Sequence, residues 1–206
     1  MIKIEKIEVY GWEAAIRGMR NPMNSWKKID TAFMGDNDII LGFDDLKLMK
    51  KLVSAGPDHS KFMRMINASM DITAPLYWWK EFDTYKVGTV VNSCSTMHKI
   101  HTKEFTLDDF SHEHLSEISK NRLIETINIL NFYRKVYFEI KEKNHWWQLI
   151  QLLPSSYNQK RTVQINYQVA QHIYNARKDH KLDEWRKLCE ILKEELPDFA
   201  EICDIK

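Results

Sequence analysis

The feature that most constrains the fold is a long run of apolar residues at helical spacing between Leu115 and Ile140. Side chains three and four positions apart lie on one face of an α-helix, so the run predicts the longest helix of the chain. Just before it, Thr106 and Asp109 resemble a capping box, with Asp in the usual Glu place. The apolar positions are Leu115, Ile118, Ile124, Ile127, Leu130, Tyr133, Val136 and Ile140.

Three other segments show strand patterns, so the chain is predicted to contain both helices and strands. Residues 2–9, the segment "NASMDITAP" and the segment "RTVQINY" alternate apolar and polar side chains, which is typical of half-buried strands. Residues 27–43 are polar with two glycines and are predicted to be a loop. The chain should therefore form a single α+β domain over residues 1–206, in which helices outnumber strands.

Further helices are predicted between these strands. One begins at Trp12 and ends near Asn21-Pro22. A second is expected to be capped by Asp44 and to end at Gly56-Pro57. The apolar segment "HWWQLIQLLP" predicts a short helix stopped by its proline. A last helix carries an apolar stripe before Pro197, made of Leu182, Trp185, Leu188, Cys189 and Leu192.

Composition excludes several classes of function. The net charge is +1 and the basic residues are scattered, which argues against a nucleic-acid-binding surface. Neighbouring tryptophans in a helix diverge by about 100°, so the two Trp-Trp pairs cannot form one stacking platform. Three cysteines without a disulfide or zinc spacing indicate a reducing compartment, and we expect the cytoplasm. No apolar run is long enough for a transmembrane helix, so no membrane partner is expected.

Motifs for catalysis are absent from the sequence. It contains no Gly-rich phosphate loop, no HExxH and no GxSxG. The histidines are irregularly spaced and no carboxylate or cysteine completes a metal site, so no metal is predicted. His172 and Arg177 lie five residues apart after a predicted strand. With Asn166 they could bind an anion or a heterocycle, or they could simply form a solvated helix face.

The stretch from Ala74 to His98 changes character within a few residues. Its first part is crowded with aromatic side chains, and the part after Gly88 is small and rich in hydroxyls. An ordinary helix, turn and strand would explain this change. A turn and strand that hold a ligand through hydrogen bonds would explain it equally well.

Three stretches, in order and at matching separations, make the chain resemble the flavin-dependent thymidylate synthases, the ThyX family. In that family an Ala-Pro precedes a helix with an Arg-His-Arg signature, followed by a turn and strand. A His precedes that Pro by about fifteen residues, and a later Leu-Pro, strand, Asn and Arg complete the pattern. The matching positions here are His59, Ala74-Pro75, Gly88, Asn92, Ser95, Leu153-Pro154, Asn166, His172 and Arg177.

The resemblance implies a fold and a set of ligands. The ThyX-like fold is α+β, with a small mixed or antiparallel sheet, flanking helices and a long helical segment. Family members are homotetramers that bind FAD at subunit interfaces. They methylate dUMP to dTMP with NADPH and methylenetetrahydrofolate. The aromatic helix after Pro75 would then pack in the core of the tetramer.

The resemblance also implies roles for individual residues. Arg177 would be the catalytic residue and would contact the pyrimidine. The substrate-binding positions would be Ser93, Cys94, Ser95 and Arg177, with Cys94 expected to be a small buried side chain. The cofactor-binding positions would be His59, Thr84, Tyr85, Lys86, Asn166 and His172.

Several positions depart from the family pattern. Thr84, Tyr85 and Lys86 stand in place of Arg-His-Arg, and Met97 and Ile150 replace two phosphate-binding arginines. Three hypotheses therefore stay open. The chain could be a flavoenzyme that makes dTMP or another 5-substituted pyrimidine nucleotide. It could be a ThyX-fold protein that binds nucleotides or regulates without synthase activity, or an unrelated helical interaction protein.

Overall fold

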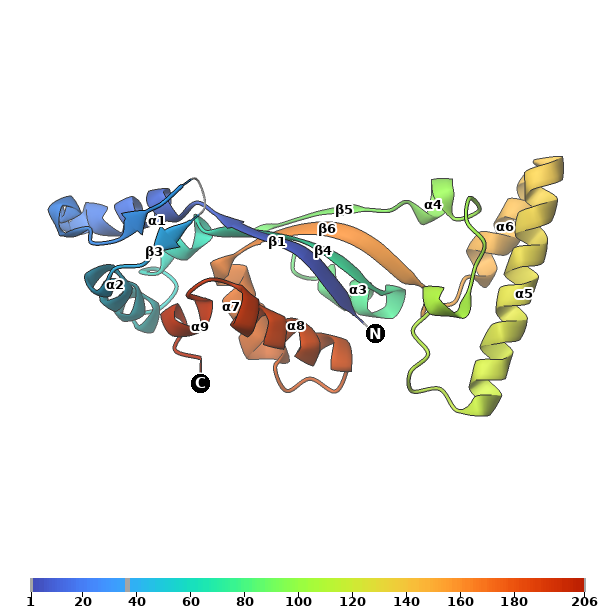
Figure 1. Ribbon diagram of the computed structural model, residues 1–206. Helices are drawn as coiled ribbons and strands as arrows, with labels where there is room; N and C mark the ends of the chain where they lie inside the picture. The colour runs from blue at the N-terminus through green and yellow to red at the C-terminus, as the bar shows by residue number, and fades with distance from the viewer. Residues whose placement is uncertain (1, 36–37, 206) are drawn as a thin grey trace. The chain divides into compact units, whose positions relative to one another are not determined.

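The computed structural model describes residues 2–35 and 38–205 and has an α+β fold (Figure 1). One sheet has the strand order β1-β4-β6-β5, and two short strands, β2 and β3, form a separate antiparallel pair. The strand bounds are β1 Lys3–Tyr10, β2 Ala32–Phe33, β3 Ile39–Ile40, β4 Asn67–Pro75, β5 Thr89–Ser93 and β6 Asn158–Asn166. The three longer predicted strands are confirmed, and the β2–β3 pair lies within the predicted loop.

Side-chain hydrogen bonds show how β4 and β6 run. The Thr162 hydroxyl donates to Asp71 at 2.7 Å, and the Gln164 amide donates to Asn67 at 3.4 Å. A residue later in β6 thus faces one earlier in β4, which is the antiparallel arrangement. The predicted fold class, a small antiparallel sheet with flanking helices and one long helix, is confirmed.

The helices fall largely where the apolar spacing predicts them. None of those in the described ranges combines the length and the apolar character that crossing a bilayer requires. Their bounds are α1 Trp12–Arg20, α2 Phe43–Ser54, α3 Leu76–Phe82, α4 Thr96–Lys99, α5 Glu117–Ile140, α6 Lys143–Leu152, α7 Tyr167–Arg177, α8 Asp183–Glu195 and α9 Phe199–Ile202. Single 3-10 turns cover Asn21–Met23, Trp26–Lys28, Lys61–Arg64 and Leu107–Asp109.

The described residues form two compact units. The first unit comprises residues 2–3, 72–84 and 92–161, and the second comprises residues 4–35, 38–71, 85–91 and 162–205. Strands of the sheet contribute residues to both. The assignment of residues 1–206 to one domain stays a prediction.

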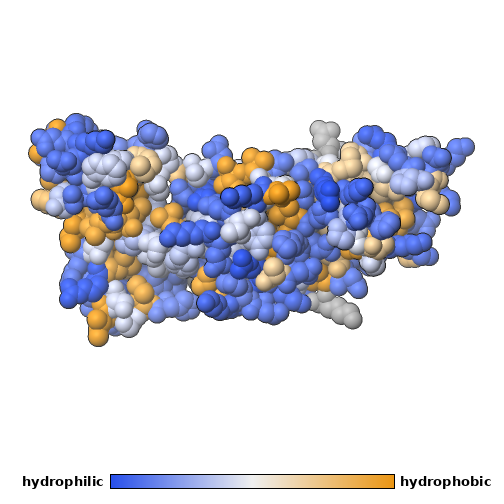
Figure 2. All heavy atoms as spheres, turned by 180° about the vertical axis from the view of Figure 1, so that it is seen from behind, coloured by the Kyte–Doolittle hydropathy of each residue, from blue (hydrophilic) through white to orange (hydrophobic). Residues whose placement is uncertain are grey.

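The long helix of the first unit is α5, and it packs against α6 around an apolar cluster. It begins at Glu117 after the N-cap Ser116, whose hydroxyl accepts from the Ser119 amide. The cluster consists of Ile100, Phe105, Phe110, Leu123, Ile127, Leu130 and Leu149. The predicted apolar face is only partly buried, because Ile118, Ile124 and Ile140 are exposed. Apolar surface gathers over the α5–α6 part of the chain in Figure 2.

The aromatic helix α3 packs inside the first unit. Trp78, Trp79 and Phe82 are each at most 1% exposed within the single chain. The two tryptophans meet edge to face, with ring centroids 4.9 Å apart, and Trp79 donates from its indole N–H to the Gln159 carbonyl at 3.0 Å. The chain's own core therefore covers these three rings, and packing of α3 in the core of a tetramer stays a prediction.

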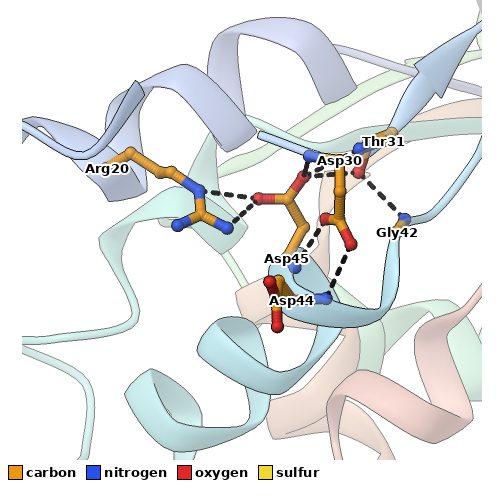
Figure 3. Close-up of polar contacts among 6 residues, drawn as sticks. All are labelled: Arg20, Asp30, Thr31, Gly42, Asp44 and Asp45. Atoms are coloured by element: carbon orange, nitrogen blue, oxygen red, sulfur yellow. Dashed lines mark hydrogen bonds and ion pairs between the residues drawn. The ribbon is translucent and has the colours of Figure 1, made fainter. Parts of the chain in front are cut away.

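In the second unit, a polar network that we call the clasp joins α1 to the start of α2 (Figure 3). Arg20 donates from Nε to Asp45 Oδ1 at 2.8 Å, and both side chains are almost fully buried. The other Asp45 oxygen accepts from the amide and hydroxyl of Thr31. Asp30 in turn accepts from the backbone amides of Asp44 and Asp45 at 2.8 and 3.0 Å.

The clasp corrects the prediction that Asp44 caps α2. The N-cap residue is Gly42, and Asp44 lies in the first turn with its side chain exposed. Asp30, fourteen residues away in sequence, supplies the carboxylate that a local cap would otherwise provide. A carboxylate at this position also suits the positive end of the helix dipole.

Candidate functional site

A cluster around Arg177 brings together residues that are far apart in the sequence. Arg177 is the last residue of α7 and is half-buried in the second unit. Its Nε donates to the Tyr85 hydroxyl at 2.9 Å. Its guanidinium carbon lies 4.6 Å from the ring centre of Trp185, which is fully buried on α8. A guanidinium on an aromatic face is held in one orientation while its edge stays available for hydrogen bonds.

Tyr85 also contacts two other rings of this cluster. Its ring centre lies 5.7 Å from that of exposed His172 and 5.8 Å from that of Trp185, both in tilted, edge-on arrangements. The structure therefore brings three predicted positions together: Tyr85, His172 and Arg177. Sequence analysis assigned Trp185 only to an apolar stripe. Its role as a platform for Arg177 depends on how α7 and α8 pack, for which the sequence carries no local signal.

Asn166 and Gly88 meet at the start of α7, at the other end of that helix from Arg177. The Asn166 side chain is the N-cap of α7 and accepts from the Val169 amide at 3.0 Å. Gly88 has φ +75, and a Cβ placed there would lie 2.6 Å from the Asn166 amide nitrogen. The turn before β5 therefore requires glycine both for its backbone conformation and for the close approach of Asn166.

The remaining predicted cofactor positions are exposed. Thr84 donates from its hydroxyl to the Glu81 carbonyl at 2.7 Å and so closes the end of α3. Lys86 lies in the turn before β5, and His59 lies in the turn after α2. The structure does not join His59 to the Arg177 cluster by any contact between described residues.

The predicted nucleotide positions Ser93, Cys94 and Ser95 lie in the first unit, at the end of β5 and the start of α4. The Ser95 hydroxyl is the N-cap of α4 and accepts from the His98 amide at 3.0 Å. Cys94 bonds through its backbone, since its amide donates to the Lys160 carbonyl and its carbonyl accepts from Gln159. Its side chain is exposed, so the expectation of a buried thiol was wrong.

Of the other two cysteines, Cys189 is buried and Cys203 is half-buried. Burial raises the pKa of the Cys189 and Cys203 thiols to about 12, so both stay protonated at neutral pH. Across the described residues, no group of three or more His, Cys, Asp and Glu side chains could hold a metal ion. The cluster of Tyr85, His172, Arg177 and Trp185 offers hydrogen-bond donors and aromatic faces, and these suit a flat ring with carbonyl groups.

The fold itself has close structural relatives. Two crystal structures of ThyX from Helicobacter pylori, each with FAD and dUMP, match the chain with TM-scores of 0.69 and 0.66. The first match covers 97% of both chains, and the second covers 96% of this chain and 97% of the other. The chain has the ThyX fold. Sequence identity is 16% in both cases, and neither a known family model nor a curated protein matches the sequence.

Two departures from the ThyX pattern have a structural counterpart. Ile150 packs against the apolar cluster of the first unit, so a side chain at this position contributes to the core. Met97 is 45% exposed, and its carbonyl accepts from the Trp146 indole at 3.1 Å. Neither position can supply the charge that a phosphate-binding arginine would bring.

The two parts of FAD, its flat ring and its diphosphate, can be compared with the side chains at the predicted cofactor positions. The ring edges of Tyr85 and His172 suit a flat ring system. The diphosphate of FAD requires cations, and of residues 84–86 only Lys86 carries a charge. The residues present therefore fit the ring part of FAD and offer one cation to its diphosphate.

Proposed function

We propose that this protein acts in pyrimidine deoxynucleotide metabolism as a flavin-dependent thymidylate synthase-like enzyme. The reaction would be methylation of dUMP to dTMP, or a related 5-substitution of a pyrimidine nucleotide. The observation that carries the proposal is Arg177, held by Tyr85 and Trp185 in a chain with the ThyX fold. FAD would be the cofactor, with NADPH and methylenetetrahydrofolate as co-substrates.

In this proposal the chain's own residues bind and polarise the pyrimidine. Arg177 donates to a ring carbonyl and stabilises the negative charge that develops on its oxygen. Tyr85 is a positioning residue, because its hydroxyl fixes the Arg177 Nε. The family resemblance, and not a contact in the structure, assigns Ser95 to the nucleotide and Asn166, His172 and His59 to the flavin ring. FAD, when bound, supplies the hydride chemistry.

The test is NADPH oxidation by the FAD-loaded protein in the presence and absence of dUMP. Arg177→Ala should abolish the dUMP-dependent rate, whereas Lys178→Ala, which removes a cation from the next position, should retain it. Tyr85→Phe should lower the rate about tenfold, because it removes one hydrogen bond that orients Arg177. Full dUMP-dependent turnover in Arg177→Ala would overturn the role assigned to Arg177.

A second candidate is a nucleotide-binding or regulatory module that has lost synthase activity. Thr84, whose hydroxyl closes α3, and Ile150, which packs in the core, favour it because both replace cations of the family pattern. The two candidates separate cleanly in one assay. Binding of dUMP without any dUMP-dependent NADPH oxidation favours the module, and turnover favours the enzyme.

We also propose that the chain forms a homotetramer. Apolar side chains on α5 support this, since Ile118 is 79% exposed and Phe132 is 60% exposed. A contiguous apolar patch on a surface usually marks an interface, and Ile129 and Phe138 of the same helix are exposed as well. Sedimentation equilibrium would show a mass four times that of the chain, and a monomer at micromolar concentration would contradict the assignment.

A further inference from the structure

A polar network of the first unit lies beside the segment 93–95, and we call it the Arg161 network. Its members are Asp83 directly after α3, Cys94 directly after β5, and Gln159 and Arg161 on β6. Residues two apart on a strand point to the same face of the sheet, so Gln159 and Arg161 lie side by side. The roles described above include neither of these two side chains.

Three contacts fix the guanidinium of Arg161. Its central carbon lies over Trp79, 4.2 Å from the ring centre of this buried side chain. Its Nη1 donates to Asp83 Oδ1 at 2.7 Å, and its Nε donates to Gln159 Oε1 at 2.9 Å. The Arg161 side chain is only 14% exposed, so a guanidinium with two distinct acceptors and an aromatic face is held in one orientation.

The contacts of the Gln159 amide allow only one orientation of that group. Arginine has no acceptor, so the amide oxygen of Gln159 must face Arg161. The amide nitrogen then faces the Cys94 carbonyl, which has no donor, and donates to it at 2.7 Å. Gln159 is itself buried. Arg161 therefore orients Gln159, and Gln159 holds the Cys94 carbonyl.

The Cys94 backbone lies where the chain leaves β5 and begins α4. Its amide donates to the Lys160 carbonyl at 2.9 Å, so the backbone of this residue is held at both of its polar groups. Ser95 follows and caps α4 by accepting from the His98 amide. A hydroxyl can accept and donate at once, so Ser95 can still donate to a ligand. The position of that hydroxyl depends on how firmly Gln159 holds the residue before it.

We propose that Gln159 and Arg161 are positioning residues for ligand binding at residues 93–95. The inference rests on the proposed function, because that function assigns this segment to the nucleotide. Met97 and Ile150 stand where ThyX has arginines, so binding here depends more on neutral donors. Hydrogen bonds from such donors weaken steeply when their geometry is lost. A segment that is already held in place also loses less conformational freedom when it binds.

The first test is the dUMP dependence of NADPH oxidation by FAD-loaded, full-length variants. Gln159→Leu removes both hydrogen bonds of the amide and should raise KM for dUMP about tenfold, with kcat within about twofold of wild type. Gln159→Glu keeps an acceptor for Arg161 but places a carboxylate oxygen against the Cys94 carbonyl, so it should raise KM at least as much. Arg161→Met, which acts through Gln159, should raise KM less, by about threefold.

A matched control lies on the same strand. Thr162→Val removes one hydrogen bond, which the Thr162 hydroxyl donates to Asp71, and should leave KM for dUMP unchanged. The rate of NADPH oxidation without dUMP should stay the same in every variant. An equal fall in this rate and in kcat would mean that Gln159 serves only the fold, and would overturn the inference.

The second test needs neither FAD nor turnover. Amide hydrogen exchange of residues 93–98 in the protein without FAD should be about tenfold faster in Gln159→Leu than in wild type, and unchanged in Thr162→Val. With an active wild type, an unchanged KM in Gln159→Leu would overturn the inference. A wild type without dUMP-dependent oxidation would overturn the proposed function instead, and unchanged hydrogen exchange in Gln159→Leu would then overturn the inference as well.

Discussion

The clasp and the turn between α5 and α6, which carries Lys141 and Lys143 and which we call the lysine turn, use positive charge in opposite ways. In the clasp, Arg20 is buried against Asp45, and every oxygen of that carboxylate accepts a hydrogen bond. In the lysine turn, the ammonium groups of Lys141 and Lys143 lie 4.1 and 5.7 Å from the ring centres of Phe138 and Trp147, without a carboxylate partner in the described structure. A buried charge needs a counter-charge inside the fold. An exposed charge is stabilised by water, so the fold does not depend on a partner for it.

The largest effect on stability is expected when the Asp45 carboxylate is removed from the clasp. Asp45→Ala should lower the free energy of unfolding by about 3–5 kcal/mol, because it leaves Arg20 buried without a counter-charge. Urea unfolding followed by circular dichroism measures this change. The control Asp44→Ala, one residue away and exposed, should cost about 0.5 kcal/mol or less.

The double variant Arg20→Met/Asp45→Leu sharpens the same prediction. Because both charges are removed together, it should recover much of the stability that Asp45→Ala loses. A single-variant loss below about 1 kcal/mol would mean that the pair contributes as little as a surface ion pair, and the contrast with the lysine turn would disappear.

A smaller effect is expected at Asp30, and it depends on pH. Burial tends to raise the pKa of Asp30, but hydrogen bonds from the amides of Asp44 and Asp45 outweigh it, and the pKa is lowered. Its contribution is therefore complete above its ordinary pKa near 3.8 and is lost as pH falls through the lower folded value. Asp30→Asn should cost about 1 kcal/mol at pH 7 and progressively less in acid, measured by urea midpoints across pH.

Removing the charges of the lysine turn should hardly change stability. Lys141→Asn/Lys143→Gln should shift the free energy of unfolding by about 0.5 kcal/mol or less, because no ion pair is broken. Thermal unfolding without ligand measures this shift. A loss comparable to that of Asp45→Ala would show that the fold depends on these two lysines, and would contradict the contrast with the clasp.

The smallest expected effect is the change in stability with salt concentration. The stability difference between wild type and Asp45→Ala should change by only about 0.3 kcal/mol when NaCl rises to about 0.5 M, because a buried pair is weakly screened. The stability difference between wild type and Lys141→Asn/Lys143→Gln should shrink toward zero over the same range, because both lysines are exposed and salt screens exposed charges. A change with salt that is equal for the two variants would contradict the contrast between the clasp and the lysine turn.

Local sequence patterns predicted much of the fold. Alternation located β1, β4 and β6, and helical spacing located α5 and α6, because each of these elements is long enough to show its period. The β2–β3 pair was missed because strands of two residues show no period. The cap of α2 was misassigned because its carboxylate, Asp30, comes from a distant loop.

The candidate site was predicted less completely than the fold, because several of its contacts join residues that are far apart in the sequence. Asn166 and Gly88 could be found from their order in the chain, and the structure places them together. The hydrogen bond from Arg177 to Tyr85 joins residues 92 positions apart, so no local pattern announces it. The exposure of Cys94 depends on how the segment after β5 lies on the surface, and this also has no signature in sequence.

The close approach at Gly88 has a consequence for how the protein can vary. In a library that samples every residue of the turn, position 88 should accept almost no replacement. Any side chain there would clash with the Asn166 amide, and the positive φ of this residue is unfavourable for residues other than glycine. Val87, 90% exposed beside it, should accept nearly all of them. Residues 84–87 can therefore vary in sequence while Gly88 stays constant. The turn can then change which ligands it binds without disturbing the N-cap of α7 at Asn166.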